Sequence, residues 1–299
     1  MANLLSRKSI PTAKRLMVFG GPTTGKTTLV GAIAKKYKVL WLDLDQGIDT
    51  LYQSLTDTEL ERIEYIRVAD TMANPIACDT LTKMFVTGGK GYICEDHSAW
   101  NCPKCRAKAS EFFVIDMAEL TLANDWVIVV DSGTHFSESC IHRVLDNSSI
   151  DITLAGKNDK ATFAVYMAQG AMLHKLLTSI QNGVNSVVMT AHELEVEMPD
   201  KSKKLVPSMG TTKFARTINS YFSSVIRTSQ VNGGFKVESL AGCSRAADVG
   251  GSPNLDLNDT KVTICDFLNP SNIGASDSGV ATTKLGGGTK LDLSKFAKK

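Results

Sequence analysis

The sequence predicts an α/β protein with a mostly parallel central sheet. Residues 16–19 and 37–45 are apolar and have the character of buried strands, and residues 27–36 between them have the spacing of an amphipathic helix. A strand, a helix and a second strand within about 30 residues form a βαβ unit, which requires a parallel sheet. The segment DWVIVVDS at residues 125–132 is the clearest buried strand of the chain. Ligands of such sheets bind at the carboxyl ends of the strands, so the functional site is expected there.

Composition indicates a globular protein with a full core. The 299 residues are 43% hydrophobic and 21% charged, enough for one large α/β domain with insertions or for two small domains. No apolar segment approaches the roughly 20 residues of a membrane span, and no signal-peptide pattern is present. We therefore expect a soluble, intracellular protein without membrane contact. The net charge of only +2 means that any nucleic-acid contact must come from local patches.

The chain divides into an arm, a core with an insertion, and a tail. Residues 1–14 are polar and basic and form an arm that leads into the first strand, and residues 15–268 form the core. Within the core, residues 88–110 are rich in glycine, cysteine and charged residues and interrupt the α/β pattern. Gly, Ser, Thr and Lys dominate residues 269–299, which predicts a flexible C-terminal tail.

Apolar periodicity places the other elements of the core. Strands are expected at residues 63–68, 185–191, 221–228, 234–240 and 261–267. Helices are expected from residue 79, at residues 136–145 and 162–181, and briefly after Asp116, which can cap a short helix. The long helix has one apolar stripe for the core, made of Leu173, Leu176, Leu177 and Ile180.

The sequence FGGPTTGKTT indicates a phosphate-binding loop with the pattern GxxxxGKT. Its glycines allow successive backbone N–H groups to face phosphate oxygens, and the helix that follows points its positive end at the same anion. A glycine turn that only packs a helix on a strand would not require the lysine, which reaches the β- and γ-phosphates, or the threonine, whose hydroxyl suits Mg²⁺. The expected ATP-binding residues are Gly20, Gly21, Pro22, Thr23, Thr24, Gly25, Lys26, Thr27 and Thr28.

Acidic residues end two of the predicted strands at the same edge of the sheet. Asp131 follows four apolar residues, as expected for the strand that carries the acid on the Mg²⁺ side of an ATPase site. Thr27 and Asp131 are therefore the expected Mg²⁺ ligands. Asp43 and Asp45 end the second strand, where they could serve the site or could simply solvate the strand end.

The order of these motifs resembles the RecA-like P-loop ATPase core. The glycine-rich loop is followed by LDLD at residues 42–45, VIVVDS at residues 127–132 and VVMTAH at residues 187–192. The resemblance is closest to the phage-encoded RecA-like ATPases of the Sak type, which are associated with single-strand annealing and recombination. It covers roughly residues 15–228 without the insertion.

This resemblance implies a catalytic set made of Lys26, Asp45, Asp131 and His192. Asp131 matches the acid that holds Mg²⁺ through water. Asp45 stands where RecA proteins carry a glutamate that polarises the attacking water, and its side chain is one methylene shorter. His192 stands where RecA proteins carry a glutamine that senses the γ-phosphate, although an ordinary histidine at a strand end is the alternative. Residues 210–215 resemble a stretch at the subunit interface of the family, so the resemblance implies a homo-oligomer, as a ring or a filament.

The insertion carries the spacing of a zinc site, CxxHx₄CxxC, formed by Cys94, His97, Cys102 and Cys105. Each two-residue spacer lets both side chains of a pair face one ion, and three thiolates with an imidazole make a closed tetrahedral Zn²⁺ site. A segment of this length has no core of its own, so metal binding would fold it. The seven cysteines are odd in number and partly clustered, which favours a reducing compartment over disulfides. A redox pair of Cys102 and Cys105 is the alternative, but it leaves the first pair without a role.

Two basic segments are candidates for contact with single-stranded DNA. In the insertion, an aromatic face and phosphate contacts could come from Trp100, Lys104, Arg106 and Lys108. The same residues could equally form the solvated face of a structural clip or a docking surface. The loop at residues 193–209, which faces the DNA channel in RecA-like proteins, carries Lys201, Lys203 and Lys204 among acidic residues. A plain solvated hairpin is the alternative for this loop.

The expected function is that of a Mg²⁺-dependent ATPase that acts on single-stranded DNA in phage-type recombination or annealing, in the cytoplasm of a bacterial host. A single-strand binding protein or another replication or recombination protein is a further expected partner. Two alternatives remain open. One is a nucleotide-switched loader or scaffold of a replication complex with little turnover, which the shorter Asp45 favours. The other is a helicase or motor of the same superfamily.

Overall fold

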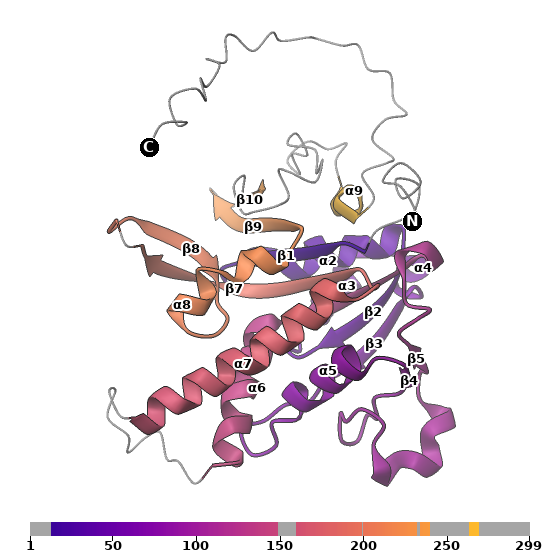
Figure 1. Ribbon diagram of the computed structural model, residues 1–299. Helices are drawn as coiled ribbons and strands as arrows, with labels where there is room; N and C mark the ends of the chain where they lie inside the picture. The colour runs from indigo at the N-terminus through magenta and orange to yellow at the C-terminus, as the bar shows by residue number, and fades with distance from the viewer. Residues whose placement is uncertain (1–12, 149–159, 199, 232–233, 240–262, 269–299) are drawn as a thin grey trace, which may run out of the picture.

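The computed structural model describes residues 13–148, 160–198, 200–231, 234–239 and 263–268. A sheet of eight strands forms its centre (Figure 1). The strands of this sheet are β1 (Arg15–Gly20), β2 (Lys38–Asp43), β3 (Ile63–Arg67), β6 (Trp126–Asp131), β7 (Val187–Glu197), β8 (Lys203–Pro207), β9 (Ser224–Val231) and β10 (Gly234–Ser239). A second, two-stranded sheet pairs β4 (Lys90–Gly91) with β5 (Ile115–Asp116).

The strand order across the large sheet is β10-β9-β1-β7-β6-β2-β3. All neighbours from β9 to β3 pair in parallel, whereas β10 is antiparallel to β9 and β8 is antiparallel to β7. The glycine-rich loop follows β1, and Asp131 ends β6. In the sheet, β7 lies between these two strands. The predicted α/β class with a mostly parallel sheet is confirmed, and the six parallel strands end at one edge.

Helices lie on both sides of this sheet. The α-helices are α2 (Lys26–Gly31), α3 (Asp49–Ser54), α4 (Asp57–Leu60), α5 (Ile76–Thr87), α6 (Gly133–Asp146), α7 (Lys160–Asn182), α8 (Thr212–Ala215) and α9 (Ile264–Leu268). Short 3-10 helices are η1 (Ala32–Lys35), η2 (Pro103–Glu111), η3 (Leu122–Asn124) and η4 (Ile218–Tyr221).

The alternation of side chains along each strand divides the core between the two faces. On β1, Met17 and Phe19 pack on the face covered by α5, α6 and α7, which contact one another (Figure 1). Leu16 and Val18 pack on the opposite face with α2, η1, α3 and α9. All four side chains are almost fully buried. Complete burial of such a side chain contributes about 1.5–3 kcal/mol, so β1 is held firmly from both sides.

Two of the predicted elements are wrong, and one predicted loop is ordered. Asp116 does not cap a helix but ends β5, where it pairs with Lys90. The end of the predicted strand at residues 261–267 is helical instead, because α9 packs Ile264 and Leu268 onto the α2 face; a short apolar run does not distinguish a strand from a helix. The segment after His192 is not a loop, since β7 continues past it and forms a hairpin with β8.

Parts of the sequence-based division fall outside the described residues. These are the first twelve residues of the arm and the whole tail at residues 269–299, so both remain predictions. The insertion is described, and it extends between β4 and β5 at the end of α5. In the part of the chain that the structure describes, no helix is both long and apolar enough to cross a membrane.

Candidate nucleotide site

The glycine-rich loop between β1 and α2 is packed tightly against β9. A Cβ on Gly20 would lie 2.3 Å from the carbonyl oxygen of Thr228, so no larger residue fits at this position. Gly25 has a φ of 83°, in the left-handed region that glycine adopts without strain. The Thr24 hydroxyl lies 2.8 Å from the Thr228 hydroxyl. Sequence and packing therefore both fix the path of this loop.

Lys26 begins α2 and turns back over the loop. Its Nζ donates hydrogen bonds to the carbonyl oxygens of Gly20 at 3.1 Å and Gly21 at 2.7 Å. Burial lowers the pKa of Lys26, and nearby carboxylates, Asp131 foremost, oppose the shift. The geometry thus keeps a cation beside the glycines, where a P-loop binds the β- and γ-phosphates of a nucleotide.

Thr27 and Asp131 meet at the same edge of the sheet. The Thr27 hydroxyl donates to Asp131 Oδ2 at 3.2 Å, and the Thr190 hydroxyl of β7 donates to Oδ1. Burial raises the pKa of Asp131 to about 6. A hydroxyl and a carboxylate in contact are the oxygen ligands that Mg²⁺ prefers, so this pair fits the metal expected at a P-loop.

Asp43 is a structural residue rather than a solvated strand end. It is fully buried and accepts hydrogen bonds from the backbone N–H groups of Asp45 at 3.0 Å and Gln46 at 2.7 Å. The Tyr65 hydroxyl of β3 donates to its other oxygen at 2.9 Å. These contacts fix the turn after β2 and thereby the direction of the Asp45 side chain.

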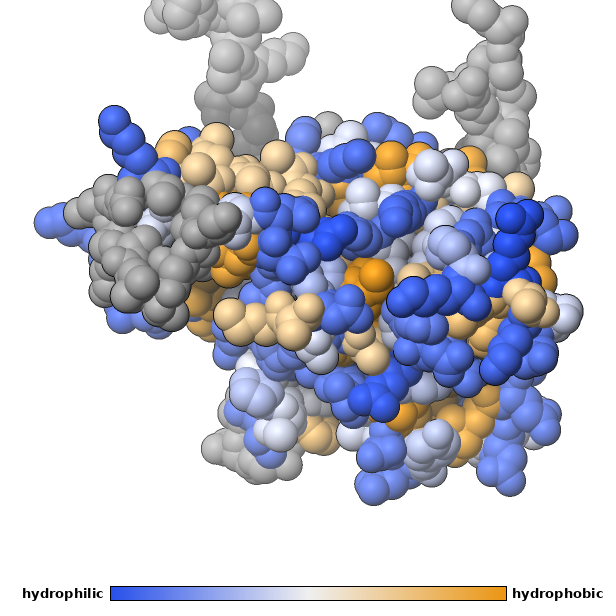
Figure 2. All heavy atoms as spheres, turned by 90° about the horizontal axis from the view of Figure 1, so that it is seen from below, coloured by the Kyte–Doolittle hydropathy of each residue, from blue (hydrophilic) through white to orange (hydrophobic). Residues whose placement is uncertain are grey.

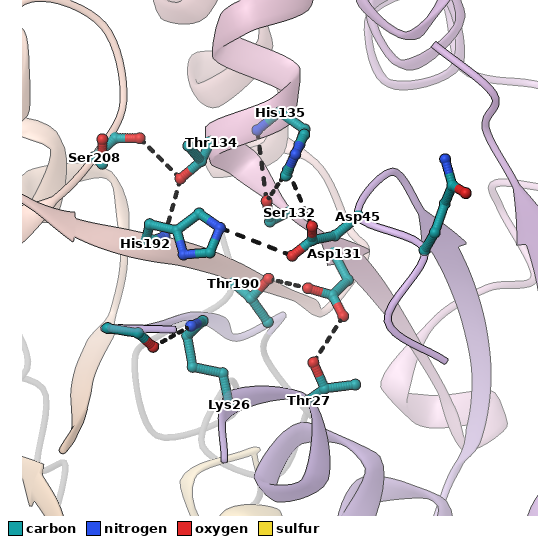
Figure 3. Close-up of polar contacts among 12 residues, drawn as sticks. Lys26, Thr27, Asp45, Asp131, Ser132, Thr134, His135, Thr190, His192 and Ser208 are labelled. Atoms are coloured by element: carbon teal, nitrogen blue, oxygen red, sulfur yellow. Dashed lines mark hydrogen bonds and ion pairs between the residues drawn. The ribbon is translucent and has the colours of Figure 1, made fainter. Parts of the chain in front are cut away.

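Asp45 faces two histidines that come from other elements (Figure 3). Nδ1 of His135, in the first turn of α6, is 3.6 Å from Asp45 Oδ1, and Nε2 of His192, on β7, is 3.9 Å from Asp45 Oδ2. Burial lowers the pKa of His192, and the charge of Lys26 adds to this effect. The structure therefore brings all four sequence-predicted catalytic residues, Lys26, Asp45, Asp131 and His192, to one edge of the sheet.

Several residues of this edge were not found by the sequence analysis. Besides His135, an ion pair joins Glu193 to Arg227 at 3.0 Å, and a Cβ on Gly21 would lie 3.3 Å from the Glu193 carboxylate. The ring of Phe235 on β10 is mostly exposed and lies against Gly25. His135 follows the VIVVDS strand by only three residues, which is the one sequence signal for it. Glu193, Arg227 and Phe235 come close to the glycine-rich loop only because β7, β9 and β10 pair in the sheet.

The four predicted zinc ligands are brought together in the insertion. Their ligand atoms all lie within 4.8 Å of one another. His97 Nδ1 is 3.2 Å from the sulfur of Cys105, 3.7 Å from that of Cys102 and 3.9 Å from that of Cys94. These spacings are close to the edges of a tetrahedron with Zn–S bonds of about 2.3 Å and Zn–N bonds of about 2.0 Å. The arrangement fits a structural Zn²⁺ site.

The insertion is docked on the core through Ser98. The hydroxyl of this fully buried residue accepts a hydrogen bond from the backbone N–H of Ala69 at 2.8 Å. The backbone carbonyl oxygen of Ser98 accepts a second one from the Thr80 hydroxyl of α5 at 2.7 Å. Trp100 is partly buried against the core, and a Cβ on Gly91 would lie 2.4 Å from its ring. One side of that ring is thus already covered.

The basic residues predicted to contact DNA lie on two separate surfaces. Lys104 and Arg106 are exposed on η2 of the insertion. The lower side of the molecule, seen in Figure 2, is mainly hydrophilic with scattered apolar patches. The β7–β8 hairpin carries the other lysines at the opposite end (Figure 1). Lys203 and Lys204 are consecutive on β8 and therefore point to opposite faces. Lys203 pairs with Glu195 at 2.7 Å, while Lys201 lies in the turn and is exposed.

A parallel sheet with the glycine-rich loop after one strand, and with a threonine in contact with the buried acid of a second strand, defines a RecA-like P-loop ATPase fold. A family model described as "AAA domain" matches residues 12–256, which is most of the chain. The protein belongs to this AAA domain family.

Other comparisons add little to this assignment. No curated protein matched the chain. Among solved structures, the flagellar accessory protein FlaH from Methanocaldococcus jannaschii is similar at 16% identity and a TM-score of 0.35, over 77% of this chain and 79% of that one. Neither its identity nor its TM-score is high enough to support a functional comparison.

Proposed function

We propose that the protein is a Mg²⁺-dependent ATP hydrolase that acts on single-stranded DNA in phage-type recombination or strand annealing. The contact of Thr27 with buried Asp131, at the edge that also presents Lys26 and Asp45, carries the hydrolase part of this proposal (Figure 3). Phosphoryl transfer to water needs a cation on the phosphates, a metal site and a group that orients the water. The resemblance of the motif order to Sak-type ATPases supports the DNA part.

Each residue has one task in this mechanism. The glycine-rich loop and Lys26 bind the phosphates and neutralise their charge. Thr27 and Asp131 would hold Mg²⁺, which would supply positive charge to neutralise the negative charge of the phosphates. Asp45 would orient the attacking water, and His192 on the central strand β7 would sense the γ-phosphate.

An ATPase assay with and without single-stranded DNA, and with and without Mg²⁺, tests this function. We expect Mg²⁺-dependent turnover that rises when DNA is added. Nucleotide binding without turnover would instead support a nucleotide-switched loader or scaffold, which the short Asp45 side chain favours. An ATP hydrolysis rate that does not change when DNA is added would reject the DNA role. ATP-driven strand displacement would assign the protein to the helicases or motors.

A structural zinc ion in the insertion is part of the same proposal. Cys94, His97, Cys102 and Cys105 would hold it, and the ion would order the turn that places Ser98 against the end of β3 and against α5. In this role the metal anchors the insertion and takes no part in hydrolysis, because four protein ligands leave no position for water.

We further propose that the protein works as a ring or filament in the cytoplasm of a bacterial host, with a single-strand binding protein or another replication or recombination protein as partner. The resemblance of residues 210–215, which include α8, to a subunit-interface stretch supports an oligomer. Light scattering with and without nucleotide and DNA measures the assembly, and a strict monomer under all four conditions would exclude it.

A further inference from the structure

The carboxylate of Asp45 lies between two imidazoles, each of which faces a different oxygen atom. His135 Nδ1 faces Oδ1 at 3.6 Å, and His192 Nε2 faces Oδ2 at 3.9 Å. One ligand atom from each of the three residues lies within 4.8 Å of the other two. The three side chains are about one-third exposed, so the cluster opens to solvent at the edge that carries Lys26. Figure 3 shows both rings directed at Asp45.

Both histidines are held by contacts outside the cluster. His135 Nδ1 is 3.0 Å from the Ser132 hydroxyl, which also caps α6. The backbone N–H of His192 donates to the Thr134 hydroxyl at 2.9 Å, and that hydroxyl donates to the carbonyl oxygen of Ser208 at 2.9 Å. The ring of His135 is therefore held on α6, and the backbone of His192 is held on β7, while Asp45 is carried by the turn after β2.

The nitrogen–oxygen distances in this cluster are close to those of hydrogen bonds. Distances of 3.6 and 3.9 Å are too long for direct hydrogen bonds, yet each nitrogen needs to approach its oxygen by less than 1 Å to form one. Catalytic hydrogen bonds are often long in the absence of substrate and shorten in its complex. Because His135 Nδ1 also lies 3.0 Å from the Ser132 hydroxyl, this requires the tautomer with the proton on Nδ1, shared between the Ser132 oxygen and Asp45 Oδ1. Two donors on separate oxygens would then prevent rotation of the carboxylate and leave its remaining lone pairs for water.

We propose that Asp45, His135 and His192 act as one unit, in which the imidazoles hold the Asp45 carboxylate toward the attacking water. This inference rests on the proposed ATPase function and adds His135 to it as a positioning residue. An aspartate reaches less far than a glutamate and has fewer side-chain torsions. Support from two rings gives this short carboxylate a defined orientation.

Steady-state kinetics of His135 variants test the proposal. His135→Ala should lower kcat roughly 10- to 100-fold and leave KM for ATP nearly unchanged, because misplacing a water-orienting group costs rate rather than binding. Asparagine places an amide nitrogen near the position of Nδ1, whereas glutamine places one near Nε2. His135→Asn should therefore recover most of the rate and His135→Gln should not. His174→Ala, an exposed histidine on α7, serves as the matched control and should behave as wild type.

A double-mutant cycle with Asp45→Asn separates positioning from a merely structural effect. If His135 acts through Asp45, His135→Ala should cost nothing further in the Asp45→Asn background, because residues of one unit are not additive. Additive losses, or equal rates for the asparagine and glutamine variants, would overturn the proposal. The proposal would also be overturned if the wild-type protein bound a second zinc ion per chain, besides that of the insertion, and His135→Ala lost it. The cluster would then be a metal site. Absence of ATP turnover in the wild-type protein would reject the ATPase function itself. An active wild-type protein together with an equally active His135→Ala variant would reject only the role of His135.

Discussion

Two glycines show how the surroundings decide what one residue type contributes. Gly20 ends β1 with the Thr228 carbonyl oxygen 2.3 Å from where its Cβ would be, whereas a Cβ on Gly170, within α7, would meet nothing within 4 Å. The first glycine is required by packing of the loop on β9. The second only adds freedom to the unfolded chain and lowers helix propensity.

Replacement of these glycines by alanine should have opposite effects. Gly20→Ala should destabilise the protein by about 1–3 kcal/mol, because the new methyl group forces β1 and β9 apart. Gly170→Ala should stabilise it by about 0.5–1 kcal/mol. Urea unfolding followed by circular dichroism measures both. A Gly20→Ala variant as stable as wild type would contradict the tight contact between the loop and β9.

If the insertion holds the proposed Zn²⁺, we expect it to behave as a separate element whose order depends on that ion. Cys102→Ser should lose the one bound Zn²⁺ per chain, because three ligands hold the ion much less well than four. Backbone amides of η2 should then exchange with solvent faster, while those of β1, β6 and β7 stay protected, since local regions open independently of the core.

Metal analysis and hydrogen exchange check this prediction. Cys265→Ser, which changes a buried thiol of the α2 face outside the cluster, should keep its zinc. Wild-type protein with reduced thiols and clearly less than one zinc per chain would count against the site.

The β7–β8 hairpin offers a test of the DNA proposal at the level of one element. Replacement of Lys201, Lys203 and Lys204 by alanine should weaken binding to single-stranded DNA and flatten its dependence on salt, because fewer counterions are released. Basal ATPase activity without DNA should stay near the wild-type level.

The geometry of β8 makes this prediction more specific. Since Lys203 is paired with Glu195 and faces away from Lys204, Lys204→Ala should reduce affinity more than Lys203→Ala. Fluorescence anisotropy over a range of salt concentrations gives both affinity and slope. If neither changes in the triple variant, Lys104 and Arg106 of the insertion become the next residues to replace.

At the scale of the whole molecule, the nucleotide site joins parts of the chain that are far apart in sequence. The loop after β1 contacts β9 and β10, and Thr27 contacts the end of β6. A ligand that binds here therefore links β1, β6, β9 and β10. Binding to the folded state alone stabilises a protein in proportion to the logarithm of ligand concentration.

Mg²⁺-ATP should consequently raise the melting temperature. At 100 times the dissociation constant the gain is about 2.7 kcal/mol, or roughly 5–10 °C for a domain of this size. Lys26→Ala should unfold near the wild-type temperature without ligand, because it removes two hydrogen bonds within the loop but no apolar core contact. It should show little of this shift and lose ATP hydrolysis, because the cation for the phosphates is gone. Differential scanning fluorimetry measures the shift, and a full shift in Lys26→Ala would argue against the phosphate role of this lysine.

Local patterns were sufficient to predict the fold class and the residues of the glycine-rich loop. The motif GxxxxGKT, the apolar strands on either side of it and the pair spacing of Cys94, His97, Cys102 and Cys105 all lie within short stretches of chain. Such patterns determine local geometry through backbone freedom and side-chain period, and these do not depend on distant partners.

Only the tertiary structure decided how those stretches are arranged in space and which of their side chains meet. Strand order placed β7 between β1 and β6, which set His192 opposite Asp45 and brought Thr190 onto Asp131. The start of α6 added His135, and the pairing of β10 with β9 placed Phe235 over the loop. Packing also turned the predicted C-terminal strand into α9 and made Asp43 a buried acceptor for the turn that carries Asp45. Apart from the bonds of Asp43 to the neighbouring residues Asp45 and Gln46, these contacts join residues that are remote in sequence, so no local pattern encodes them. They follow from how the sheet and its helices bury their apolar faces.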